Sequence, residues 1–120
     1  MQVDHQCRGE FVVTSIVGEL DTPDANEAWT ELLEVLDFSP RGVVLDLARC
    51  TYIASAGISL IVRLVQQLRP VHASVRIANV SPRLRLVLDT VNLPSLVPVD
   101  GTIDEAIGKL ARIVQHAPLA

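Results

Sequence analysis

The chain has 120 residues and a formal net charge of −4, and 49% of its residues are hydrophobic although only 3% are aromatic. This length predicts a single domain over residues 1–120 with one core of Val, Leu, Ile and Ala, while the acidic balance and the scarcity of aromatic rings argue against a nucleic-acid partner. No apolar run reaches the roughly 18 residues of a membrane span and residues 1–10 are polar, so we expect a cytoplasmic protein with neither membrane insertion nor a signal peptide.

The N-terminal part of the chain predicts a β-hairpin. Residues 2–8 form a short candidate strand, and Glu10 to Val17 form a clearer one that Gly18 ends. Its side chains alternate between two faces, as expected of a strand: Phe11, Val13, Ser15 and Val17 on one, and Val12, Thr14 and Ile16 on the other. The intervening Arg8-Gly9 predicts a tight turn and an antiparallel edge on a mixed sheet.

The next element is a helix, which we expect Asp21 or Thr22 to cap, with Pro23 at its first position. Its apolar stripe comprises Ala25, Ala28, Trp29, Leu32, Leu33 and Leu36. The opposite side is acidic and carries Asp24, Glu27, Glu31, Glu34 and Asp37. Such a face is either solvated or a docking surface for a basic partner, and the pattern leaves both readings open.

The middle of the chain predicts a buried strand, a turn and a helix. Gly42 to Leu47 is an apolar run of strand length, typical of the centre of a parallel sheet. The chain then turns through residues 48–54, and helical spacing begins at Ser55 and stops at Pro70. The expected buried face is Ile58, Ile61, Val62, Val65 and Leu68. We expect Ser55 to be the N-cap and Gly57 to leave the helix start bare.

The remaining elements alternate in the same way. Residues 74–80 predict a strand, with Val75 and Ile77 on one face, and Ser81 caps a helix with Pro82 at its first position. We expect that helix to bury Leu84, Val87, Leu88 and Val91. Asn92 suits a left-handed C-cap, and residues 96–99 predict an edge strand because they contain Pro98. Thr102 to Glu105 is a capping box that opens the last helix.

Alternating strands and helices predict an α/β domain with a mixed, mostly parallel sheet of about five strands and about four helices. Ligand-facing residues of such folds lie outside the carboxyl ends of the strands. Three loops should gather there, at residues 18–23, 48–55 and 79–82. That arrangement would bring Asp21 and Thr22 near Ser55.

No pattern in the sequence predicts catalysis, a metal or a cofactor. There is no phosphate-binding glycine loop, zinc helix or nucleophile elbow. The histidines are scattered, so we expect His5, His72 and His116 on the surface, and Cys7 and Cys50 are read as free thiols. A nucleophilic Ser55 would need a base within hydrogen-bond reach, and no histidine lies on the three loops. We therefore expect a protein that is not an enzyme.

Two motifs lie in these loops at a fixed separation. One is Asp46-Leu47 followed by Tyr52-Ile53-Ala54-Ser55-Ala56-Gly57-Ile58, and the other is Gly18-Glu19-Leu20-Asp21. Together they resemble the signature of the STAS domain, the fold of bacterial anti-sigma-factor antagonists, and the resemblance covers nearly the whole chain in element order and length. The family usually has aspartate-serine-serine-glycine-leucine at the helix start. Here Ala54 replaces the aspartate and Ala56 the second hydroxyl, which leaves Ser55 as the match to the family's phosphorylated serine.

The resemblance implies an anti-sigma-factor antagonist with no cofactor. Unphosphorylated, it would bind an anti-sigma factor that is also a serine kinase and so free a sigma factor. Phosphorylation of Ser55 would switch it off, and a serine phosphatase would reverse the change. The implied contact surface comprises Asp21, Thr22, Tyr52, Ile53, Ala54, Ala56, Gly57, Ile58 and Ser59.

Two other functions stay open. Because Ala54 departs from the family pattern, the chain could be a STAS subunit without a phosphoswitch, in a lipid-transport or sensory scaffold assembly. An enzyme such as a nucleotide hydrolase is a more distant alternative, tested by turnover.

Overall fold

The computed structural model describes residues 2–21 and 25–116. Its strands are β1 (Gln2–Arg8), β2 (Phe11–Leu20), β3 (Gly42–Asp46), β4 (Cys50–Ile53), β5 (Ser74–Ala78) and β6 (Val99–Asp100). Its α-helices are α1 (Ala25–Leu33), α2 (Ser55–Leu68), α3 (Pro82–Thr90) and α4 (Ile103–His116). Three short 3-10 helices are η2 (Glu34–Phe38), η3 (Arg69–Val71) and η4 (Leu93–Ser95). The predicted α/β class, with four helices and a mixed sheet, is confirmed.

The sheet is parallel except at one edge. Its order is β1-β2-β3-β5-β6, and β4 pairs with the far part of β2. Only the β1–β2 pair is antiparallel, so the predicted hairpin is confirmed. Gly9 at its turn has a φ of +64°, a conformation that glycine adopts without strain. Strand β6 pairs with β5 alone, which confirms an edge strand in this part of the chain. Its predicted bounds of residues 96–99 were wrong, because β6 is Val99–Asp100 and begins only after Pro98, which has no amide hydrogen to donate.

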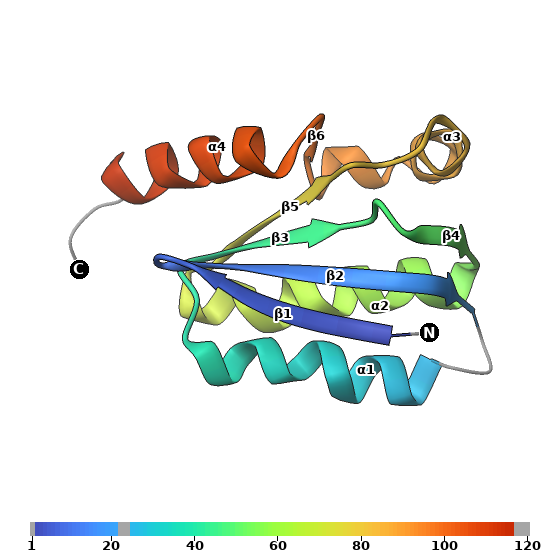
Figure 1. Cartoon of the computed structure of the whole chain (residues 1–120), viewed down its shortest axis with the longest axis horizontal. Coiled ribbons are helices and arrows are strands. Elements are labelled where there is room, and N and C mark those ends of the chain that lie inside the picture. Colours follow the sequence, from blue (N-terminus) through green and yellow to red (C-terminus); the bar gives the residue numbers. More distant parts are fainter. Residues whose placement is uncertain (1, 22–24, 117–120) are drawn as a thin grey trace.

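Helices cover both faces of the sheet. Helices α1 and α2 lie side by side on one face and α4 lies on the other, as Figure 1 shows. The larger core contains Val12, Ile16 and Leu45 together with the buried faces of α1, α2 and α3. The smaller core packs Ala106 and Leu110 of α4 against the opposite face of the sheet. The two-faced alternation of β2 is therefore confirmed. Among the described residues, no helix is long and apolar enough to span a bilayer.

Two elements at the carboxyl end of the sheet differ from the sequence prediction. Strand β2 does not end at Gly18 but continues to Leu20, with an irregularity in register between Gly18 and Glu19. The segment expected to be only a turn contains β4, which pairs with this extension. Gly18 has a positive φ of 98° at this irregularity. Glycine adopts a positive φ with less strain than residues that carry a Cβ atom. The extension then gives β4 a partner.

The buried faces of two helices also differ from the expected ones. In α2 the fully buried residues are Leu60, Ile61, Leu64 and Leu68, whereas Ile58, Val62 and Val65 are only partly buried. In α3, Leu84 and Leu88 are buried as expected, but the exposed fractions of Val87 and Val91 are 37% and 50%. Each prediction was therefore right in part, for Ile61 and Leu68 of α2 and for Leu84 and Leu88 of α3, and wrong for the rest because apolar residues occupy more than one face of each helix.

Most predicted helix ends are confirmed. Ser81 caps α3 and its hydroxyl accepts from the Leu84 amide at 3.2 Å, and Asn92 is left-handed. Thr102 accepts from the Glu105 amide at 3.1 Å, while the Glu105 carboxylate accepts from Gly101 rather than from Thr102 itself. The first helix was expected to be capped by Asp21 or Thr22 with Pro23 at its first position; of these, Thr22 and Pro23 lie outside the described residues.

Candidate partner-binding site

The carboxylate of Asp46 joins three strands where the site begins. It accepts from the Ser15 hydroxyl of β2 at 3.1 Å and from the Asn79 amide after β5 at 3.1 Å. The backbone amide of Ala48 donates to the same carboxylate at 3.0 Å. These bonds fix the carboxyl ends of β3 and β5 relative to the middle of β2. The predicted convergence of the three loops is thus confirmed for the described residues.

Backbone hydrogen bonds then place the start of α2 against the end of β2. The Gly18 amide donates to the Arg49 carbonyl at 2.9 Å. The Ala54 amide donates to the Leu20 carbonyl at 3.0 Å. Since Asp21 follows Leu20 directly, the structure places it near Ser55, as expected. Thr22 lies outside the described residues.

Helix α2 begins one residue earlier than predicted. Ala54 is the N-cap, with φ −92° and ψ 174°, and it offers no side-chain hydrogen bond. The amides of Gly57 and Ile58 both donate to the Ala54 carbonyl, at 2.9 and 3.1 Å. Ser55 is therefore the first helical residue and not the cap, which corrects the sequence prediction. The amides of Ser55 and Ala56 precede these bonded ones and point out of the helix end, where an anion would be stabilised.

Gly57 faces the interior rather than a partner. A Cβ atom at Gly57 would lie 2.7 Å from the Leu20 carbonyl oxygen and 2.8 Å from Leu20 Cγ. The residue is buried. The expectation that Gly57 leaves a bare surface for a partner is therefore wrong, because the space beside its Cα atom is filled by Leu20. The missing side chain instead allows α2 to approach β2 closely.

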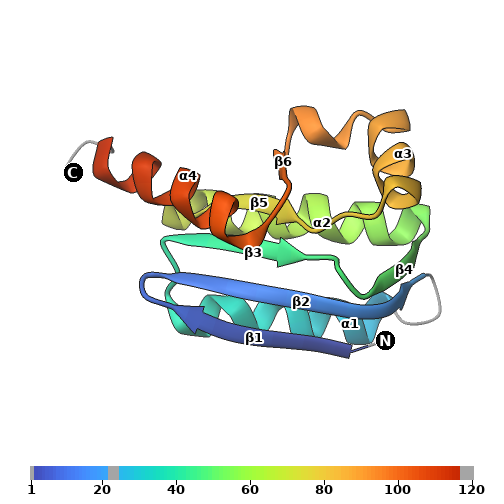
Figure 2. The same ribbon diagram turned by 45° about the horizontal axis from the view of Figure 1, so that its top comes forward.

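A groove of about 500 Å³ lies beside this helix start, between β4 and α3. Figure 2 shows α3 standing next to the N-terminal end of α2. The lining residues are Tyr52, Ile53, Ala54, Ser55, Ile58, Ser59, Val87 and Val91. We call this the Ser55 groove. Its walls are mostly apolar, and the exposed fractions of Tyr52 and Val91 are 52% and 50%. Exposed apolar side chains gathered in one groove are typical of an interaction site.

The structure brings six of the ten predicted site residues into the Ser55 groove: Tyr52, Ile53, Ala54, Ser55, Ile58 and Ser59. Ser55 is exposed. The Ser59 hydroxyl donates a hydrogen bond to the backbone carbonyl of Ser55 at 3.1 Å. Ala56 is half-buried and lies outside the groove lining. Asp21 is also half-buried, and its Oδ1 atom has no hydrogen bond from the described part of the chain.

Sequence reasoning missed Val87 and Val91, which it assigned to the core. No sequence signal marked them as exposed, because Leu84, Val87, Leu88 and Val91 have the i, i+3, i+4, i+7 spacing of a single buried face. Leu86 and Val87 lie next to Leu88 in sequence and are both exposed.

The described lining of the groove contains no carboxylate, imidazole or amine beside the Ser55 hydroxyl. None of its described lining residues is charged at neutral pH. His5 lies elsewhere, bonded to the Thr14 hydroxyl and the Glu31 carbonyl at 2.9 and 2.8 Å; it is half-buried, so its expected surface position is corrected. Residues 2–21 and 25–116 contain no cluster of three potential metal ligands. Such a site can bind an apolar protein surface and present a serine hydroxyl.

Comparisons with known proteins agree with this geometry. The STAS domain model matches residues 2–106. The chain is 30% identical to BtrV of Bordetella bronchiseptica, whose name assigns it as an anti-sigma factor antagonist; the match covers 80% of this chain and 83% of BtrV. An anti-sigma factor antagonist from Mycobacterium paratuberculosis is 21% identical with a TM-score of 0.79, over 92% of this chain and 93% of that one.

The antagonist SpoIIAA has the same fold in two forms. Its unphosphorylated form is 20% identical with a TM-score of 0.67, over 97% of this chain and all of the other. The phosphorylated form of Bacillus SpoIIAA is 21% identical with a TM-score of 0.66, over 91% and 99% of the two chains. At these identities the structures show the shared fold.

Proposed function

This chain belongs to the STAS domain family, and from that premise we propose that it is an anti-sigma-factor antagonist. It binds an anti-sigma factor and so frees a sigma factor for transcription. The observation that carries the proposal is the Ser55 groove, in which an exposed serine stands beside unpartnered apolar side chains of β4 and α3. The relationship to BtrV supports the same function.

We propose further that the Ser55 groove is where the anti-sigma factor docks. Tyr52, Val87 and Val91 supply exposed apolar area, which is the usual centre of a protein interface. Hydrogen bonds to the Asp46 carboxylate and to the Leu20 carbonyl hold the loops around it, so little ordering is needed on binding. A preformed surface of this kind reduces the entropy cost of association.

Phosphorylation of Ser55 would then act as an off-switch. A phosphate adds nearly two negative charges and three acceptor oxygens. At the first position of α2 it meets free amides and the positive end of the helix, so the fold tolerates it. The groove, however, holds no charged lining residue to neutralise it. Burying the phosphate against a partner would cost several kcal/mol, enough to weaken binding by about a hundredfold or more.

The enzymes of the switch are also proposals. An anti-sigma factor of the serine-kinase type would phosphorylate Ser55, and a serine phosphatase would restore the binding form. The existence of phosphorylated and unphosphorylated SpoIIAA supports a switch of this kind on the same fold. The protein itself would be substrate and binding partner without catalysing a reaction.

The test compares Ser55→Asp with Ser39→Asp in a titration against the co-purifying anti-sigma factor. Ser39 is exposed, has a φ of 48° that aspartate tolerates, and precedes β3 at the opposite end of the strand from the groove. We expect Ser39→Asp to bind like the wild type and Ser55→Asp about a hundredfold more weakly. Equal affinity of both variants would refute the off-switch. Mass spectrometry of the native protein asks directly whether Ser55 carries phosphate.

One observation favours a second function. Ala54 occupies the N-cap, where the family's aspartate would both cap α2 and lie beside the serine. Without that carboxylate the chain fits a STAS subunit that lacks a phosphoswitch, in a transport or scaffold assembly. Co-purification separates the two: a kinase-like anti-sigma factor supports the first function and transporter or scaffold subunits support the second.

A further inference from the structure

Strand β5 has an outer edge that β6 covers only in part. Strand β6 pairs with Ile77 and Ala78 and with no earlier residue of β5 among those described. The Ile77 amide donates toward this edge, to the Pro98 carbonyl at 2.8 Å. Alternate residues of a strand point their backbone groups to the same side. The N–H and C=O of Val75 therefore face the same edge, beyond the reach of β6.

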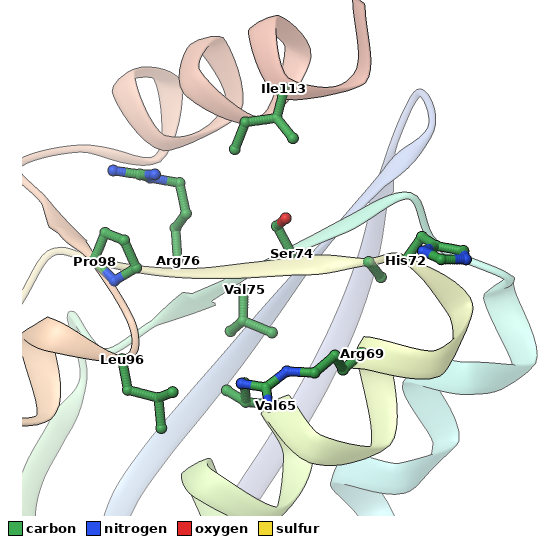
Figure 3. Close-up of a pocket in the computed structure, with 10 residues that line it drawn as sticks. Val65, Arg69, His72, Ser74, Val75, Arg76, Leu96, Pro98 and Ile113 are labelled. Carbon is green, nitrogen blue, oxygen red and sulfur yellow. The ribbon is translucent and has the colours of Figure 1, made fainter. Parts of the chain in front are cut away.

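A groove of about 690 Å³ lies along this open edge. Figure 3 shows its two walls: Val75, Val65, Arg69 and Leu96 lie on the α2 side of β5, and Ser74, Arg76 and Ile113 lie on the α4 side. Pro98 closes one end of the groove and His72 lies at the other. The groove thus runs along β5 between the two helical layers. This is the position that an additional strand of the sheet would occupy.

The walls are apolar and positively charged. Leu96 and Ile113 are large apolar residues with exposed fractions of 40% and 45%. Arg69 is exposed, and Arg76 is held by the buried Asp100 carboxylate at 2.6 Å. None of the described residues that line the groove is acidic. A carboxylate in the groove would therefore find Arg69 without a competing acid among those lining residues.

We propose that this β5-edge groove binds an extended, acidic and apolar segment of a partner protein, which adds a strand to the sheet beside Val75. Main-chain hydrogen bonds to Val75 supply affinity, and alternate side chains of the segment contact Leu96 on one face and Ile113 on the other. Arg69 selects for a carboxylate. The open stretch from Ala73 to Arg76 accommodates about four residues at ~3.3 Å each. The site shares no lining residue with the Ser55 groove, so a segment bound there does not occupy the proposed phosphoswitch surface.

The experiment uses the full chain and a fluorescent acetylated probe of sequence Glu-Val-Thr-Val-Glu, followed by anisotropy and by amide NMR shifts. We expect saturable binding with a dissociation constant near millimolar or tighter and a shift of the Val75 amide. A probe N-methylated at its central residue cannot pair with the strand, and a Lys-Val-Thr-Val-Lys probe has the wrong charge. Both should bind at least about tenfold more weakly.

Matched protein variants test the assignment to this groove. Arg69→Glu should weaken the acidic probe about tenfold, while Arg83→Glu, which changes an exposed arginine of α3, should not. If Arg69→Glu fails to fold, Arg69→Ala replaces it with the same expected direction. The proposal is overturned if the acidic probe does not bind, if the N-methylated probe binds equally well, or if the shifts fall outside β5 and its flanking helices. Equal binding of the N-methylated probe would instead identify a site for small apolar anions.

Discussion

Replacing Gly57 with alanine should destabilise the protein, although alanine is the better helix former. The added Cβ would lie 2.7 Å from the Leu20 carbonyl oxygen, whereas ordinary contacts begin near 3.4 Å. The helix start must therefore move away from β2 by roughly 0.7 Å (3.4 − 2.7), against the Ala54–Leu20 hydrogen bond of 3.0 Å. Backbone cannot rotate aside as a flexible side chain would.

The expected magnitude follows from two opposing terms. Greater helix propensity favours alanine by at most about 1 kcal/mol, and by less in a first turn. Overpacking a buried contact costs about 1–3 kcal/mol. The net loss is about 1–2 kcal/mol, which lowers the melting temperature of a domain of this size by about 3–6 °C per kcal/mol.

Gly108→Ala is the matched control. Gly108 is also helical, but a Cβ there would meet nothing within 4 Å. It should raise the free energy of unfolding by up to about 1 kcal/mol. Thermal and urea denaturation of the two variants measure the difference directly. If Gly57→Ala is as stable as the wild type, the close approach of α2 to β2 is not real and the placement of the Ser55 groove fails with it.

Three further predictions concern single sites. Ala54→Asp should raise the free energy of unfolding by about 0.5–2 kcal/mol, because it supplies the missing cap of α2; unchanged urea denaturation would contradict this. Asp100→Asn should cost of the order of 3 kcal/mol at neutral pH, because it leaves Arg76 without its buried partner. Arg76 holds the pKa of Asp100 below its usual value, so this stabilisation is present above the ~3.9 of an unfolded aspartate and is lost as pH falls through the lower folded-state value. The difference between wild type and Asp100→Asn should therefore shrink below about pH 4, and a constant difference would contradict the assignment. A thiol reagent at pH 8 should label exposed Cys7 and spare Cys50 until unfolding, because burial raises the pKa of the Cys50 thiol; equal labelling rates would contradict that burial.

Local sequence was enough to predict those helix ends that are marked by a capping residue. Ser81 and Thr102 cap helices as expected because a hydroxyl beside free amides needs no tertiary context. Asn92 likewise ends α3 in the left-handed conformation. The alternating pattern of β2 was also enough to predict which of its residues face each helical layer, since successive side chains of a strand point to opposite faces of the sheet.

The predictions were wrong where the sequence allowed two local structures and contacts with distant residues selected one of them. In α2, Ile58 and Val62 are as apolar as Leu60 and Leu64, so hydropathy alone could not fix which row faces the sheet. The one-residue shift of the cap from Ser55 to Ala54 has a similar cause, because the Ala54 amide is engaged by Leu20 of another strand. Strand β4 is only four residues long, and it exists because β2 continues beyond Gly18 to pair with it.

For the candidate site, the motif located the groove but not its second wall. Tyr52, Ser55 and Ser59 follow from the stretch around one helix start. Val87 and Val91 come from a helix some thirty residues further along the chain. Their exposure depends on how α3 docks, which the sequence does not state.

The pairing of β2 with three other strands has a consequence for how the chain folds. The contact between β1 and β2 crosses only the turn at Gly9, so it closes quickly. The pairing of Phe11 with Gly42, and of Gly42 with Ser74, must each wait for a helix-sized loop to close, which is the slow entropic step. Val13 pairs with Gln6 of β1 and with Val44 of β3. It therefore takes part in both the fast hairpin closure and the slow parallel pairing. Truncating the Val13 side chain should slow folding, whereas truncating Leu110 of α4, which we expect to pack after the strands have paired, should mainly speed unfolding.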